Sequence, residues 1–195
     1  MTGSGERRSP AGGPAQEAEP DGGGEDTPQT GGLLIDIVAD GGDWAFVPDV
    51  EAVVMAAAQA AARFPQSRLS GASAAVALSS DTAVSTLNTA YRGQPKSTNV
   101  LSFPAFAAAR QEHGAERFIG DVVLAAGTIA AEAADQGIPP VHHLQHLVIH
   151  GLLHLTGYDH QTDAEAEAME TLEATILASL GITDPYAEDG ADPPR

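Results

Sequence analysis

The order of apolar and polar positions divides the central part of this chain into short apolar runs and longer amphipathic stretches. The short runs are rich in branched or small apolar residues and end at Gly, Pro, Asp or Ser, which is typical of strands. They predict strands at residues 33–38, 72–78, 98–103 and 118–124. The longer stretches begin at capping residues or Pro and end at Gly or Pro, which is typical of helices. They predict helices at residues 50–64, from the capping residues 79–81 to about Tyr91, and at 125–136. A further helix begins at Pro139 and carries His150 and His154, and a last one runs from just after His160 to Leu180.

The last predicted helix has a capping signal and two distinct faces. Residues 162–165 read Thr-Asp-Ala-Glu, which fits a capping box, and Gly181 follows the helix. Apolar residues recur at intervals of three and four along one face, namely Met169, Leu172, Ile176 and Leu180. The solvated face is predicted to carry Glu165, Glu167, Glu170 and Glu173.

Strands and helices that do not strictly alternate predict an α+β domain, with a mixed sheet of about four strands and about five helices. Residues 1–32 are rich in Gly and Pro, carry scattered acids and hold no apolar run, so they are predicted to be a disordered leader. Residues 184–195 have a similar composition and are predicted to be a disordered tail. The folded unit is therefore expected at residues 33–183, which is an ordinary size for one domain.

Composition limits which residues can bind a metal and which kinds of partner are expected. The chain has no cysteine, so any metal must be held by His, Asp or Glu. Its formal net charge of −18 counts against binding a polyanion through bulk charge. The basic residues of the predicted folded unit all precede residue 118, however, so a local basic surface is possible. No apolar run approaches the roughly 20 residues of a membrane span, and no hydrophobic segment follows Arg7 and Arg8, so we expect a cytoplasmic protein with no membrane partner.

Three histidines give the main functional signal. His150 and His154 are four residues apart, so on a helix they share one face, about 6 Å apart along its axis. Gly157 permits a reversal of the chain that can bring His160 back to them. Three neutral imidazoles with a fourth position left to water are typical of a catalytic zinc site. A structural metal is the alternative and would need a fourth protein ligand, for which His146, one turn earlier, is the candidate.

The spacing of these histidines equals that of the metzincin peptidases, which read HExxHxxGxxH. Gly151 stands where those enzymes carry the glutamate that deprotonates the metal-bound water, and a peptidase without that base should be badly impaired. The motif therefore favours hydrolysis of another bond. No side chain is an obvious general base, since Asp159 is expected to orient a histidine and Tyr158 to pack beside the site.

The residues around this motif resemble those of a known family. HGLLHLTGYDH at residues 150–160, followed by EAEAMETLE at residues 165–173, is similar to the signature of the YbeY endoribonuclease family. LNTAYR at residues 87–92, TNVLSFP at residues 98–104 and IGDVV at residues 119–123 resemble its earlier blocks. The resemblance covers about residues 33–183.

The resemblance implies a zinc-dependent, single-strand-specific endoribonuclease that acts in 16S rRNA 3′-end maturation and in ribosome quality control. It implies one Zn²⁺ per chain, held by His150, His154 and His160, and a catalytic role for Arg92. The implied partners are single-stranded rRNA and the ribosome or its 30S subunit, not DNA. Two positions depart from the family pattern, since Pro95 and Ser97 stand where the family usually has Asp and Pro.

Several alternatives stay open at this point. Arg92 ends a predicted helix, where a cation also stabilises the negative end of the helix dipole. The nucleophile is either water or the RNA 2′-hydroxyl. A non-catalytic ribosome assembly or binding factor with a structural metal is the second function, and a metzincin-like peptidase, disfavoured by Gly151, is the third.

Overall fold

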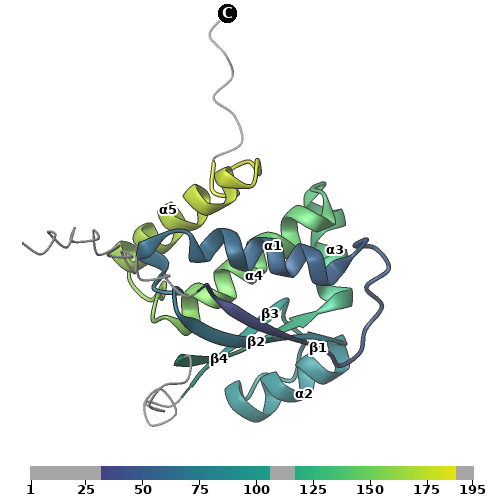
Figure 1. Cartoon of the computed structure of the whole chain (residues 1–195). Helices are drawn as coiled ribbons and strands as arrows, with labels where there is room; N and C mark the ends of the chain where they lie inside the picture. Colours follow the sequence, from purple (N-terminus) through teal and green to yellow (C-terminus); the bar gives the residue numbers. More distant parts are fainter. Residues whose placement is uncertain (1–31, 106–116, 188–195) are drawn as a thin grey trace, which may run out of the picture.

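The computed structural model describes residues 32–105 and 117–187, which form four strands, five α-helices and one 3₁₀ turn (Figure 1). The strands are β1 (Leu34–Ala39), β2 (Ala72–Ser79), β3 (Val100–Pro104) and β4 (Arg117–Ala125). The helical elements are α1 (Val50–Ala62), η1 (Pro65–Ser67), α2 (Asp81–Arg92), α3 (Ala126–Gln136), α4 (Pro140–Leu155) and α5 (Asp163–Ser179).

The four strands form one mixed sheet in the order β1-β2-β4-β3. β1, β2 and β4 run parallel to one another, and β3 pairs antiparallel with β4 at the edge of the sheet. The predicted α+β class, with a four-stranded mixed sheet and five helices, is confirmed. The predicted strand limits differ from the observed ones by one or two residues, which is usual at the ends of elements.

The predicted leader and tail fall mostly outside the described residues. Of the leader at 1–32 only Gly32 is described, and of the tail at 184–195 only residues 184–187. The part of the chain that is described contains no helix long and apolar enough to cross a membrane.

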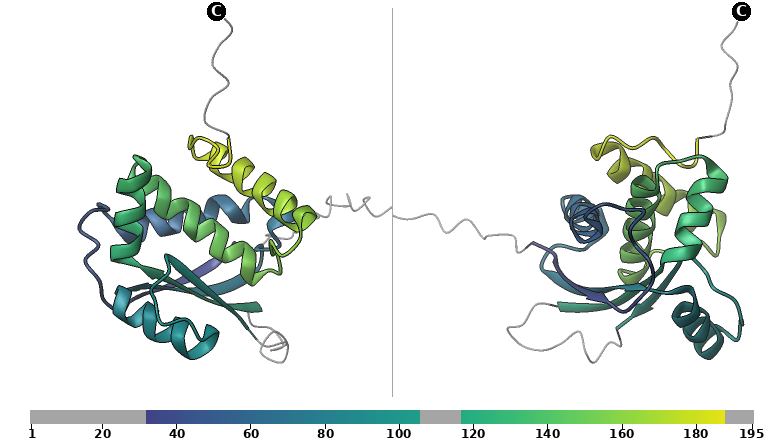
Figure 2. Two further views of the ribbon diagram at one scale, coloured as in Figure 1. Left: turned by 180° about the vertical axis from the view of Figure 1, so that it is seen from behind. Right: turned by 90° about the vertical axis from the view of Figure 1, so that its right-hand side faces the viewer.

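The helices lie on both faces of the sheet, but unequally. α1 and α4 cover one face, with α3 and α5 packed beside α4, and α2 lies against the other face (Figures 1 and 2). α4 is the most enclosed helix because it contacts the sheet, α1, α3 and α5. Most of its apolar side chains are fully buried, namely Leu144, Val148, Ile149, Leu152, Leu153 and Leu155. A half-buried row remains at every fourth position and consists of His142, His146, His150 and His154.

Gly151 lies where α4 comes closest to the sheet. The Ser102 hydroxyl of β3 donates a hydrogen bond to the Gly151 carbonyl at 3.1 Å. A Cβ atom at residue 151 would lie only 2.8 Å from Val122 Cγ1 of β4 and 3.3 Å from Ser102 Oγ. Glycine is therefore required here by packing against the sheet.

Asp81 ties α2 to the start of α3. Its carboxylate accepts hydrogen bonds from the backbone N–H groups of Gly127 at 2.9 Å and Thr128 at 2.7 Å, and from the Thr128 hydroxyl. The Ser97 hydroxyl donates a further bond at 3.2 Å. Because α3 has no side-chain cap of its own at Ala125, Asp81 supplies the missing acceptor from another helix.

These bonds also affect the ionisation of Asp81. Partial burial opposes the charged form, but the hydrogen bonds from Thr128, Gly127 and Ser97 outweigh it and hold the pKa of Asp81 below its ordinary value. The Ser97 hydroxyl thus contributes to the contact between α2 and α3.

We expect Gly151→Ala to lower the free energy of unfolding by roughly 1–3 kcal/mol, because the new methyl group meets Val122 in a packed interior. Urea denaturation of the metal-free protein measures this loss. Ala134→Gly, at an exposed position of α3, measures the helix propensity of one methyl group, which by itself favours alanine over glycine. An unfolding midpoint for Gly151→Ala equal to wild type would contradict the close packing.

We expect Asp81→Ala to lower the free energy of unfolding at neutral pH by about 1–2 kcal/mol, the usual cost of a lost helix cap. Since the pKa of Asp81 is lower in the folded state, its contribution is present above the ordinary pKa and disappears as pH falls through the folded pKa. The difference between wild type and variant should therefore shrink below about pH 4. Denaturation at several pH values tests this, with Asp135→Ala in the last turn of α3 as control, and a pH-independent difference would count against it.

Candidate metal centre

The turn after α4 determines where the third histidine lies. Gly157 has a φ of 98°, in the left-handed region that the spacing requires. Its N–H donates to the His154 carbonyl, and the N–H of Tyr158 donates to the Leu153 carbonyl, both at 3.1 Å. The Tyr158 hydroxyl donates to the Gln66 carbonyl at 3.0 Å, so the turn is also fixed from outside. The chain reverses at Gly157 and returns past the end of α4.

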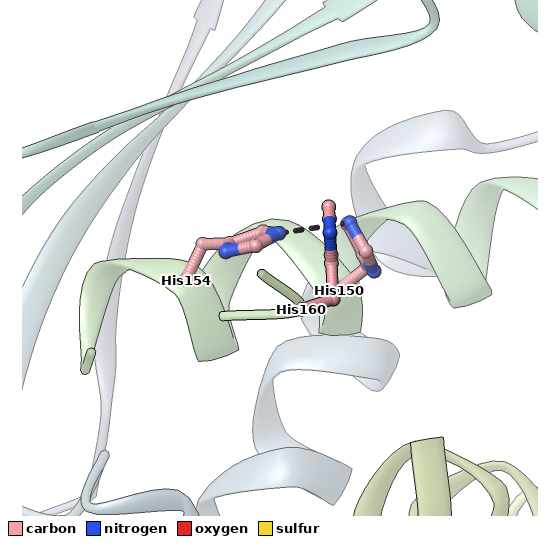
Figure 3. Close-up of side chains that lie close together, drawn as sticks. All are labelled: His150, His154 and His160. Carbon is pink, nitrogen blue, oxygen red and sulfur yellow. Dashed lines mark hydrogen bonds between the residues drawn. The ribbon is translucent and has the colours of Figure 1, made fainter. Parts of the chain in front are cut away.

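This reversal brings the three histidine rings together (Figure 3). The ring centroid of His160 lies 5.8 Å from that of His150 and 5.1 Å from that of His154. One ring nitrogen of each residue lies within 4.8 Å of the others. His150 and His154 are half-buried and His160 is exposed, so the group opens to solvent on one side.

The hydrogen bonds at Nδ1 determine which nitrogens face one another. His150 Nδ1 lies 2.8 Å from Glu173 Oε1, and His154 Nδ1 lies 2.9 Å from the carbonyl oxygen of Tyr158. A carboxylate and a carbonyl only accept, so each Nδ1 carries the hydrogen and each Nε2 keeps a lone pair.

These two Nε2 atoms are only 3.0 Å apart (dashed line in Figure 3). Two lone pairs at this distance repel unless a proton or a cation lies between them. Burial lowers the pKa of His154 and so favours its neutral form, and the nearby His150 ring acts in the same direction whenever it is protonated. Neutral imidazoles that present Nε2 are good ligands for zinc, so this donor set fits a metal ion better than a proton.

Glu173 was predicted to lie on the solvated face of α5, and this prediction is wrong. Its side chain is 0% exposed. Besides the bond from His150, its Oε2 accepts hydrogen bonds from His146 Nε2 at 3.2 Å and from the Tyr186 hydroxyl. Burial opposes the charged form, but the bonds from His146, His150 and Tyr186 together lower the pKa of Glu173 to about 2. Glu173 is thus a buried carboxylate that orients His150.

The sequence contained a signal for this position. Residues 169, 172 and 176 are apolar and follow intervals of three and four, and residue 173 completes the same row. The helical period assigns residue 173 to the buried face, but its charged side chain led to the prediction of a solvated position. Glu165 and Glu167, by contrast, are exposed as predicted.

Asp159 differs from its expected role, whereas His146 lies beside the three histidines. Asp159 does not orient a histidine ring: its carboxylate accepts hydrogen bonds from the backbone N–H of His160 at 2.8 Å and from Gln161 Nε2 at 2.6 Å. These bonds lower the pKa of Asp159. His146 belongs to a separate group with His150 and Glu173, and no other His, Asp or Glu of the described residues joins the group of three histidines. A fourth side-chain ligand, which a structural metal would need, is therefore not found in this part of the chain.

A cleft of about 640 Å³ connects the histidines with the other predicted site residue. Arg92, the last residue of α2, lines it together with Asn99, Ser102 and the three histidines. Arg92 is exposed. Residues more than fifty positions apart in the sequence thus share one cleft, which combines a guanidinium group with a potential metal site.

The structure gives a packing reason for the glycine at residue 151, in addition to the missing glutamate noted in the sequence. The residue after the first histidine faces Val122 and Ser102 of the sheet. A glutamate there would meet the sheet at the point of closest packing. The arrangement therefore excludes the peptidase base from this position by packing as well as by sequence.

Comparison with known proteins finds a family model and similar chains that match this one. The family model "Endoribonuclease YbeY" matches residues 47–181. A Rhodopseudomonas palustris (strain BisA53) protein named "Endoribonuclease YbeY" is 51% identical over 161 residues, covering 82% of this chain and 92% of that protein. An Azorhizobium caulinodans protein of the same name is 44% identical over 156 residues, covering 80% of this chain and 97% of that protein. The solution structure of a Thermotoga maritima protein matches at 22% identity with a TM-score of 0.47, over 83% of this chain and 100% of that one.

We expect the purified protein to bind one zinc ion per chain and His154→Ala to lose it, because that substitution removes one of the facing Nε2 atoms. Metal analysis after dialysis against limiting chelator measures the stoichiometry. His142→Ala is the matched control, since His142 lies in the same row of α4 but outside the group. Undiminished zinc in His154→Ala would eliminate the site.

Proposed function

The chain belongs to the YbeY endoribonuclease family, and we propose on that premise that it cleaves single-stranded RNA with the help of one zinc ion. Family membership makes it a hydrolase that acts on RNA. The observation that carries the zinc-dependent proposal is the pair of Nε2 lone pairs, 3.0 Å apart, in the cleft that Arg92 lines. A phosphodiester in this cleft would meet both the zinc ion and the guanidinium group of Arg92.

In this proposal His150, His154 and His160 hold the zinc ion. A zinc ion there would supply a Lewis acid beside the scissile phosphate. Glu173 and the Tyr158 carbonyl hold the rings of His150 and His154 in the tautomer that presents Nε2. The protein thus arranges its ligands before substrate arrives.

Arg92 would bind the phosphate. A guanidinium can donate two parallel hydrogen bonds to phosphate oxygens, and it stabilises negative charge that develops there during transfer. Gly93 ends α2 with a left-handed φ of 68°, and its N–H donates to the Thr89 carbonyl at 3.1 Å, so the backbone beside Arg92 is fixed. The net charge of −18 should repel RNA at long range, but RNA binding also depends on the local potential in the cleft. The guanidinium of Arg92 makes that local potential more positive.

The biological substrate in this proposal is the 3′ end of 16S rRNA, with the ribosome or its 30S subunit as partner and the cytoplasm as location. The support is the family alone. Water and the RNA 2′-hydroxyl are distinguished by the products, because attack by the 2′-hydroxyl leaves a 2′,3′-cyclic phosphate and attack by water does not.

The two rival functions have less support. A non-catalytic assembly factor with a structural zinc would need four protein ligands, whereas the group among the described residues has three. A peptidase would need a general base at residue 151, where the sheet leaves no room for a side chain.

We expect Arg92→Glu to reduce cleavage of a single-stranded RNA oligonucleotide by roughly 100-fold or more while zinc content stays at one per chain, because the charged hydrogen bonds to phosphate are lost. Lys96→Glu is the matched control: it makes the same change of charge at an exposed residue that does not line the cleft.

Both variants are compared with His154→Ala purified by the same protocol, so that contaminating ribonuclease is recognised as activity common to all preparations. Cleavage by Arg92→Glu at the wild-type rate would contradict the role of the arginine. Cleavage by His154→Ala at the wild-type rate would contradict the metal-dependent function itself.

A further inference from the structure

We propose that Tyr186 is a positioning residue that fixes the carboxylate of Glu173 and, through it, the zinc-binding face of His150. The inference rests on the proposed function in one respect, the zinc site at His150, His154 and His160. Tyr186 lies outside residues 47–181, the part of the chain that the family model matches. It also lies in the stretch whose composition predicted a disordered tail.

The segment after α5 is built to bring Tyr186 back to the metal centre. Gly181 has a φ of 75°, and the N–H of Ile182 donates to the Leu177 carbonyl at 3.0 Å, which turns the chain after the helix. Ile182 is buried in the main core. The Asp184 carboxylate then accepts a hydrogen bond from the backbone N–H of Tyr186 at 2.9 Å, which closes a local turn.

The phenol ring ends this segment directly over the buried carboxylate. The Tyr186 hydroxyl donates to Glu173 Oε2, and His146 Nε2 lies 3.1 Å from the same hydroxyl oxygen. The rings of His146 and Tyr186 meet edge to face, with centroids 5.7 Å apart and an interplanar angle of 88°. Tyr186 is 37% exposed and Glu173 is 0% exposed, so the tyrosine lies between the carboxylate and solvent.

Glu173 depends on its donors because it is charged and shielded from water. A buried carboxylate is stable only when hydrogen bonds replace its lost hydration. Its Oε1 accepts from His150, and its Oε2 accepts from His146 and Tyr186. Burial and the charge of Glu173 raise the pKa of Tyr186, so the hydroxyl keeps its proton and acts as a donor throughout the physiological range.

The bonds at Oε2 hold Oε1 on His150. A carboxylate that accepts the second ring N–H of a metal-ligating histidine fixes the ring and increases the basicity of the ligating nitrogen. If the tyrosine hydroxyl is lost, water can reach Oε2 and the carboxylate can rotate. His150 then spends less time with Nε2 directed at Nε2 of His154, and zinc binds more weakly.

Tyr186→Phe tests this link because it removes one hydroxyl and keeps the ring. Zinc affinity is measured by competition with a chromophoric chelator, without RNA. We expect Glu173→Gln to weaken zinc binding by roughly 10–100-fold and Tyr186→Phe by a smaller factor, roughly 3–10-fold. Tyr91→Phe is the matched control, since Tyr91 is 70% exposed and lies on α2, which carries none of the three histidines.

A double-mutant cycle separates positioning from a general effect on folding. In the Glu173→Gln background, Tyr186→Phe should have little further effect on zinc affinity, because its route to His150 is already broken. Denaturation of each metal-free variant checks that the fold persists. Zinc affinity of Tyr186→Phe equal to that of Tyr91→Phe, or the same loss in both backgrounds, would overturn the inference.

These outcomes are distinct from failure of the proposed function. If wild type binds zinc tightly and Tyr186→Phe does also, only the role of Tyr186 fails. If the variants change zinc affinity as expected but wild type does not cleave RNA, the positioning role stands and the endonuclease proposal fails. If wild type binds no zinc at these histidines, both fail.

Discussion

The candidate metal centre depends on two hydrogen bonds, which hold the Nδ1 atoms of His150 and His154. Their acceptors come from different parts of the fold, the Glu173 carboxylate on α5 and the Tyr158 carbonyl in the turn after α4. Each bond determines the tautomer and rotation of one ring, and together they bring the two Nε2 atoms to 3.0 Å from each other. The capping box that starts α5 and the glycine that reverses the chain therefore serve the same purpose. The site is preorganised by the folding of the chain around α4.

α4 can carry this site because its apolar faces pack in the core while its row of histidines stays partly exposed. Its apolar faces are buried against the sheet and the neighbouring helices, and Gly151 permits the closest approach. The row of histidines is the part that stays half-buried. A helix held by so many neighbours keeps His150 and His154 in place, and only His160 must be supplied by a turn. The joint at Asp81 similarly ties α2, which ends at Arg92, to α3.

Much of this architecture follows from local sequence. The helices, the strands, the capping box at Thr162 and the turn at Gly157 are encoded by periodicity and by residues with special backbone preferences, so they could be predicted. The histidine cluster could be predicted because its three members lie within one helix and the turn that follows. The roles of Asp81, Glu173 and Tyr186 could not, since each depends on a partner in another element of the fold. The helical period could have placed residue 173 on the buried face of its helix, but it gives no sign of the partner that Glu173 contacts there. Tyr186 stands among Gly, Pro and Asp and gives no local sign of its contact either.

The close approach at Gly151 also has an evolutionary consequence. Glycine and glutamate codons can differ by a single nucleotide. One nucleotide change could therefore convert residue 151 to the glutamate of the peptidase motif. In this fold that mutation would force α4 away from β3 and β4, where Ser102 and Val122 lie. A shared ligand pattern therefore does not make the two chemistries neighbours in accessible sequence space, because the route between them passes through a damaged core. Purifying selection at this glycine would protect the fold first and the reaction only indirectly.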